Sequence, residues 1–91
     1  MYLVKFTSKF KKNYKLMCKR GLDISLLDHV INELRNGRDL DTKYEDHQLS
    51  GNLIGLRECH IKPDWLLVYY IKRDILTLTL VNTGSHSDVF K

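Results

Sequence analysis

The stretch Trp65-Leu66-Leu67-Val68-Tyr69-Tyr70-Ile71 is apolar throughout and is built from residue types that favour β-strands. A strand with two apolar faces is buried on both sides, which is typical of the middle of a sheet. We therefore expect helices to cover one face of this strand and loops or a ligand to cover the other.

A further strand is predicted on each side of this central one. Leu53 to Ile61 precedes it across the turn Lys62-Pro63-Asp64, and Ile75 to Val81 follows it across the loop Lys72-Arg73-Asp74. In both segments apolar and polar residues roughly alternate, with the period of two residues that is typical of strands. Connections this short join antiparallel neighbours, so the three strands are expected to form an antiparallel meander.

The N-terminal half predicts one strand and two helices. Residues 2–6 form the short strand, and Thr7-Ser8 then offers a cap for a helix that ends at Gly21. Asp23 offers a cap for a second helix that ends at Gly37. One face of this second helix is apolar at Ile24, Leu27, Val30, Ile31 and Leu34.

Residues 38–51 show no regular spacing of apolar residues, so a loop is predicted here. The resulting order, β-α-α-β-β-β, predicts one α+β domain over residues 1–91, with a twisted antiparallel sheet and both helices packed on one face. The composition, with 43% hydrophobic and 29% charged residues, is that of an ordinary globular chain. No apolar run approaches the roughly 20 residues of a membrane span, and no signal peptide is recognisable, so we expect a cytoplasmic protein that does not bind membranes.

Cysteine and charge restrict the possible partners. Cys18 and Cys59 fit no metal or redox spacing, so free thiols are expected, with a disulfide as the alternative. The formal charge is +4, the pI is near 9.1, and the excess of basic residues lies early, from Lys5 to Arg20. A basic stripe suits a polyanion such as nucleic acid, although these lysines also suit the solvated face of a helix.

The chain has four histidines, His29, His47, His60 and His86, and three of them lie next to turn signals. Histidine exchanges a proton near neutral pH because its ordinary pKa is about 6.5. A zinc site is not favoured, since no pair has a metal-ligand spacing. Acyl transfer is not favoured either, because no nucleophile elbow surrounds the neighbouring Ser85.

Two interpretations of the histidines remain. In one, histidines and a carboxylate cleave a phosphodiester by general acid-base catalysis, with lysine or arginine stabilising the phosphate. In the other, each histidine is an ordinary surface or capping residue, and we adopt this second interpretation for His29 in the middle of the second helix.

Three segments carry a family resemblance: Asp46-His47-Gln48-Leu49, His60-Ile61-Lys62-Pro63-Asp64-Trp65, and Thr83-Gly84-Ser85-His86 with Phe90. Their sequence, order and spacing closely resemble the YafQ branch of the RelE/ParE superfamily of bacterial toxins, over essentially the whole chain. The resemblance implies a ribosome-dependent endoribonuclease that cuts mRNA. It also implies a co-encoded antitoxin, DinJ- or RelB-like, that neutralises the toxin.

The resemblance further implies roles for single residues. His47, His60, Asp64 and His86 match the proton-transfer set, while Trp65 and Phe90 match residues that position RNA by stacking. The 2′-hydroxyl of RNA is then the nucleophile, so no metal or cofactor is expected, and the products carry a 2′,3′-cyclic or 3′-phosphate and a 5′-hydroxyl. An aromatic residue that begins a central strand also suits the core, which is the alternative for Trp65.

One position departs from the family pattern. Asn82 stands where an arginine usually precedes the Thr-Gly pair, and a neutral amide cannot offset the charge of the transition state. The candidate replacement cations are Arg57, Lys62, Arg73 and Lys91. Arg57 is three residues from His60 along a predicted strand. Because side chains alternate between the two faces of a strand, Arg57 points away from His60 unless a bulge lies between them. Two alternatives to the nuclease thus stay open: a toxin that acts by binding, as gyrase-directed relatives do, and a catalytically weakened relative.

Overall fold

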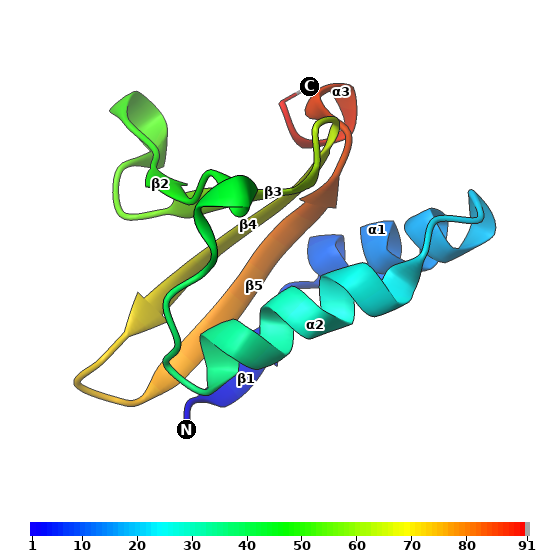
Figure 1. Ribbon diagram of the computed structural model, residues 1–91. Coiled ribbons are helices and arrows are strands. Elements are labelled where there is room, and N and C mark those ends of the chain that lie inside the picture. Colours follow the sequence, from blue (N-terminus) through cyan, green and yellow to red (C-terminus); the bar gives the residue numbers. More distant parts are fainter. Residues whose placement is uncertain (91) are drawn as a thin grey trace.

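The computed structural model describes residues 1–90 of the chain. A five-stranded sheet carries a pair of long helices and one short C-terminal helix (Figure 1). The elements are β1 (Leu3–Phe6), α1 (Ser8–Lys19), α2 (Ile24–Arg35), η1 (Thr42–Tyr44), β2 (His47–Gln48), η2 (Gly51–Leu53), β3 (Arg57–Lys62), β4 (Trp65–Lys72), β5 (Thr77–Gly84) and α3 (His86–Val89).

The strand order is β1-β5-β4-β3-β2, with β4 in the centre. The predicted antiparallel meander of β3, β4 and β5 is confirmed. The expectation of a wholly antiparallel sheet is wrong for β1, because β1 pairs with β5 in parallel, Phe6 opposite Leu80. The helices α1 and α2 separate β1 from the meander, so no tight turn fixes the direction in which β1 joins it.

Two strands have other bounds than the sequence predicts. β3 begins at Arg57, because residues 51–53 form a 3-10 turn and Ile54 is 81% exposed. β5 runs on to Gly84, beyond the predicted end at Val81. The loop at 38–51 contains a strand of two residues, β2, whose His47 pairs with Glu58 of β3.

Both helices begin as predicted. The Thr7 hydroxyl accepts a hydrogen bond from the Phe10 amide at 3.0 Å, and the Asp23 carboxylate accepts one from the Ser25 amide at 3.2 Å. The two helices lie together on one side of the sheet (Figure 1) and share one core with the strands. The core side chains are Phe10, Met17, Leu27, Val30, Leu34, Cys59, Ile61, Trp65, Leu67, Tyr69, Leu78 and Leu80.

The opposite face of the sheet is also partly closed. Leu66 and Val68 of β4 are buried there, outside the core that the helices cover, and they pair with His60 and Glu58 of β3. β2 lies at one side of this region and α3 at the other (Figure 1). Within residues 1–90, no helix has the length and apolar character that a membrane crossing requires.

Candidate active site

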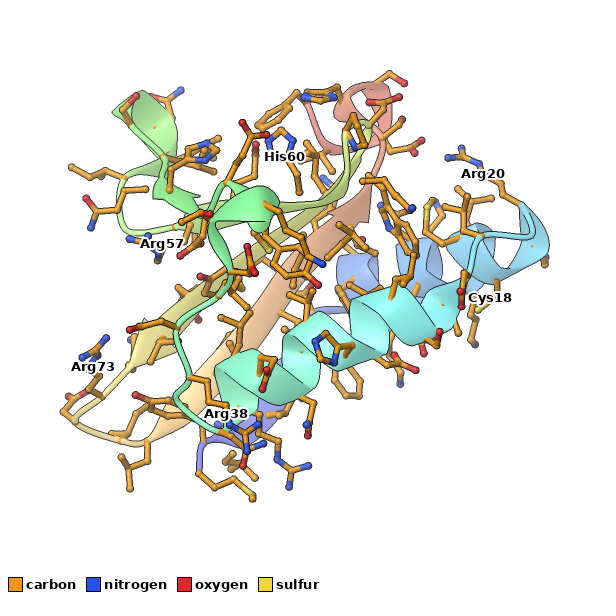
Figure 2. The ribbon with its side chains drawn as sticks, viewed as in Figure 1. Cys18, Arg20, Arg38, Arg57, His60 and Arg73 are labelled. Atoms are coloured by element: carbon orange, nitrogen blue, oxygen red, sulfur yellow. The ribbon has the colours of Figure 1, made fainter. Side chains whose placement is uncertain are left out.

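His60 is the centre of a cluster of three histidines. Figure 2 shows the labelled His60 on the face of the sheet away from the long helices. The ring centroids lie 6.2 Å apart for His47 and His60 and 5.9 Å apart for His60 and His86. The side chain of His60 is 19% exposed, whereas those of His47 and His86 are about half exposed. The structure thus brings together three histidines that are distant in the sequence.

Glu58 joins this cluster and was not predicted from the sequence. Its carboxylate lies 3.4 Å from His60 Nε2 and 3.7 Å from His47 Nε2, and its side chain is only 6% exposed. Its second oxygen, Oε2, is buried and has no hydrogen-bond partner among residues 1–90. The signal was present in the sequence, because residues 58 and 60 of a strand point to the same face.

Asp64 holds the third histidine. In the turn between β3 and β4, its Oδ1 accepts hydrogen bonds from the His86 amide at 2.9 Å and from His86 Nδ1 at 2.6 Å. These two bonds, the amide first, hold the pKa of Asp64 below its ordinary value. Because the carboxylate only accepts, His86 Nδ1 carries the hydrogen and Nε2 is left for a substrate.

The short helix α3 is fixed at its start by a capping box. Ser85 caps it, and the Asp88 carboxylate accepts hydrogen bonds from the Ser85 amide and from two nitrogens of Arg20, at 2.6 and 3.1 Å. The Arg20 guanidinium holds the pKa of Asp88 well below its usual range. Gly84 is required here, because a Cβ at this position would lie 2.6 Å from the Asp88 Cβ.

The two predicted aromatic residues differ in their surroundings. Trp65 is 3% exposed in the core, where its indole Nε1 donates to the Thr83 hydroxyl at 3.1 Å, so it has no face on which an RNA base can stack. The core interpretation of Trp65 is therefore the one that the structure supports. Phe90 is 46% exposed, and its ring lies beside His86, with 6.5 Å between the centroids.

The predicted cations do not reach the histidines. Arg57 lies on the helix-facing side of β3, where it is bonded to Asp46 at 2.9 Å, and the bulge comes only after His60. Lys62 lines a recess beside Leu26 of α2, and Arg73 lies in the turn after β4. Figure 2 shows Arg57 and Arg73 apart from the labelled His60. Lys91 lies outside the described residues.

The Asn82 side chain is buried against α1 and is not part of the histidine cluster. It is 4% exposed, and its amide oxygen accepts a hydrogen bond from Asn13 Nδ2 of α1 at 2.7 Å. The side chain is thus directed toward the helix and not toward the histidines. The pairing of β4 with β5 shifts register between Val68 and Tyr69, next to Asn82, and such an irregularity changes the face to which a side chain points.

The remaining candidates lie outside the cluster. His29 is exposed on α2. Cys18 and Cys59 are free thiols, and burial raises the pKa of the Cys59 thiol. Within residues 1–90, no three histidine, cysteine or carboxylate side chains are arranged to hold a metal ion.

Comparisons with known proteins show which family this chain belongs to. Residues 2–91 match the family model described as the bacterial toxin of a type II toxin-antitoxin system, YafQ. The mRNA interferase toxin YafQ of Escherichia coli K12 is 32% identical over 88 residues, which cover 96% of this chain and 94% of that protein. A metal-bound toxin from Helicobacter pylori is 47% identical, with a TM-score of 0.92 over 99% of this chain and all of that one. YafQ in the E. coli DinJ-YafQ complex is 30% identical, with a TM-score of 0.90 over the full length of both chains.

Proposed function

Because this chain belongs to the YafQ family of type II toxins, we propose that it is an mRNA endoribonuclease that acts on the ribosome. The observation that supports this proposal best is the pair His60 and His86, with 5.9 Å between their ring centroids and a carboxylate bonded to or beside each ring. Two such groups can serve one phosphodiester, one as base and one as acid.

The proposed chemistry uses a nucleophile that RNA itself supplies. One group takes the proton of the 2′-hydroxyl, whose oxygen forms a bond to phosphorus, and the other protonates the 5′-oxygen as its bond to phosphorus breaks. His86 acts through Nε2, because its Nδ1 is bonded to Asp64. The products are a 2′,3′-cyclic phosphate and a 5′-hydroxyl, and the route requires neither a metal nor a nucleophilic side chain.

Glu58, His47 and Phe90 complete the proposed site. The Glu58 carboxylate lies 3.4 Å from His60 Nε2 and 3.7 Å from His47 Nε2, and we assign it the positioning of both rings. No lysine or arginine among residues 1–90 forms an ion pair with this cluster. Phe90 beside His86 offers a ring on which a base can stack.

We propose the cytoplasm as the place of action, since ribosomes and mRNA are the targets. The DinJ-YafQ complex is an assembly of a toxin with its antitoxin, and we propose a DinJ-type antitoxin as the partner that neutralises this chain.

The test of this proposal is the substitution His86→Ala. We expect the rate of mRNA cleavage on purified ribosomes to fall by about 10²- to 10⁴-fold, the usual contribution of a general acid or base, with ribosome affinity almost unchanged. His29→Ala is the matched control and should retain the parent rate, because His29 lies on α2. If His86→Ala arrested translation as strongly as the parent, with no cut mRNA in either case, the protein would act by binding and the nuclease proposal would fail.

A further inference from the structure

Asp46 directly precedes His47 in the chain, but its side chain lies on the other face of the sheet. Because side chains alternate along an extended chain, neighbours in this segment point to opposite faces. The pairing of His47 with Glu58 and of Gln48 with Arg57 fixes the alternation. His47 Nε2 accordingly lies 3.7 Å from Glu58, whereas Asp46 is bonded to Arg57 on the helix-facing side. One short segment thus contacts both faces of the sheet.

The Asp46 carboxylate uses both of its oxygens. Oδ1 accepts a hydrogen bond from the Tyr69 hydroxyl at 2.6 Å, and Oδ2 accepts two from Arg57, at 2.9 and 3.3 Å. Burial and the Asp46 carboxylate raise the pKa of Tyr69 above its ordinary value, so its hydroxyl remains a donor. Arg57 and Tyr69 face each other across β3 and β4, and Tyr69 is only 1% exposed. Asp46 is therefore tied to the centre of the sheet by bonds to an ionised group, which are roughly twice as strong as neutral ones.

β2 is too short to hold His47 in place by burial. Both of its residues are exposed, so the strand contributes no side chain to the core. The preceding Glu45 has a φ of 50°, in the left-handed region that few residues other than glycine adopt. His47 Nδ1 donates to the Glu45 carbonyl at 2.7 Å, so the ring follows the local backbone wherever that backbone moves. The orientation of His47 thus depends on what fixes this backbone, and Asp46 lies between the two residues.

The groups that hold Asp46 are separate from the histidine cluster. Asp46, Arg57 and Tyr69 line a cavity of about 410 Å³ on the helix-covered side, next to Leu34 near the end of α2. The sheet lies between this cavity and the histidines. These three side chains therefore affect the cluster through His47 and not by contact with a phosphate bound there.

We propose that Asp46, held by Tyr69 and Arg57, is a positioning residue that anchors His47 from the far side of the sheet. The catalytic use of His47 rests on the proposed function, whereas the anchor rests on three hydrogen bonds and on the alternation of side chains. When the anchor is released, His47 loses its fixed distance to Glu58. A displacement of about 1 Å at a reacting group can cost about 100-fold in rate.

The experiment uses Asp46→Asn and Tyr69→Phe in the full-length chain. Asp46→Asn turns an amide donor toward one of two existing donors, and Tyr69→Phe removes the hydroxyl while keeping the buried ring. We expect kcat for mRNA cleavage on purified ribosomes to fall by about 10- to 100-fold, with KM almost unchanged. Nuclear magnetic resonance should show weaker Overhauser contacts between His47 and Glu58. Those contacts report the position of the ring independently of catalysis.

Asp28→Asn and Tyr14→Phe are the matched controls. The Tyr14 hydroxyl donates to the Asp28 carboxylate at 2.9 Å, which is the same kind of bond, but it joins α1 to α2 at the surface. Both controls should keep the parent kcat and the parent contacts of His47.

A His47→Ala background decides whether Asp46 acts through the ring. In that background Asp46→Asn should lower kcat no further, because the group that it positions is absent. An equal loss in both backgrounds would overturn the inference, and so would a parent-like kcat with intact contacts between His47 and Glu58. If Asp46→Asn did not fold, Tyr69→Phe would supply the same comparison. If the parent itself cut no mRNA, the nuclease proposal would fail, while the Overhauser contacts would still test the anchor.

Discussion

Asn82 shows how the surroundings of one residue decide what its identity means. The family resemblance places it where an arginine is expected, which suggests a missing catalytic cation. The structure instead directs Asn82 toward α1, where its amide oxygen accepts hydrogen bonds from Asn13 and from the Thr83 backbone. A neutral amide suits this buried place better than a charge does, because an unpaired buried charge is costly. Asn82 therefore belongs to the packing of β5 against α1.

Asn82→Arg is accordingly expected to destabilise the protein and not to raise its activity. The guanidinium would replace a side chain that is only 4% exposed and whose side-chain partner, Asn13, is a neutral amide. We expect the free energy of unfolding to fall by about 2 kcal/mol or more, measured by urea denaturation followed by circular dichroism. A variant that is as stable as the parent and cuts mRNA faster would show that this side chain turns toward the histidines.

The helix α3 is an element that cannot stand alone. Four residues are too few for an independent helix. Its position depends on the bonds from Asp64 to His86 and from Arg20 to Asp88 and on the absence of a side chain at Gly84. Arg20 at the end of α1 and Asp64 in a strand turn thus hold one catalytic candidate from two sides.

Asp88→Asn tests this dependence through pH. Arg20 holds the pKa of Asp88 below its ordinary value of about 3.9. The stabilisation by this carboxylate is therefore complete above pH about 4 and declines as the pH falls further. We expect Asp88→Asn to lower the free energy of unfolding by about 1 kcal/mol at neutral pH, and the difference from the parent to shrink at pH about 2.5. Asp74→Asn is the control, because Asp74 is an exposed carboxylate in the turn after β4. A difference that persists undiminished in acid would contradict the role of the Asp88 charge.

Sequence periodicity and caps were sufficient for most elements but not for their assembly. The Thr7 and Asp23 caps and the β3–β4–β5 meander follow from local rules. The parallel pairing of β1 with β5 does not, since it joins residues more than 70 positions apart. His47, His60, Asp64 and His86 were named as site residues from the family resemblance. Glu58 was missed, because the sequence does not show which face of β3 is left uncovered by the helices.

Basic and acidic residues are distributed unevenly over the molecule. The first 22 residues contain only basic charges, whereas the rest of the chain has more acidic than basic residues, and Glu58 and Asp64 lie at the histidine cluster. The basic charges lie on β1 and α1. One face of the sheet therefore carries the histidines and their carboxylates, and the other side of the molecule carries the lysines of β1 and α1.

This separation predicts that salt slows the association of antitoxin with the toxin. An acidic partner is steered by the lysines of β1 and α1, and dissolved ions screen that attraction, with a Debye length of about 10 Å at 0.1 M and about 3 Å at 1 M. We expect the association rate constant, measured by stopped-flow fluorescence, to fall by about 10-fold between about 0.05 and 0.5 M salt, with a smaller change in the dissociation rate constant. A variant with Lys12→Gln and Lys19→Gln should show a flatter salt dependence, because two steering charges are removed while the apolar side chains of α1 stay unchanged. A rate constant independent of salt would mean that the lysines do not steer the antitoxin and that apolar contact alone governs its docking.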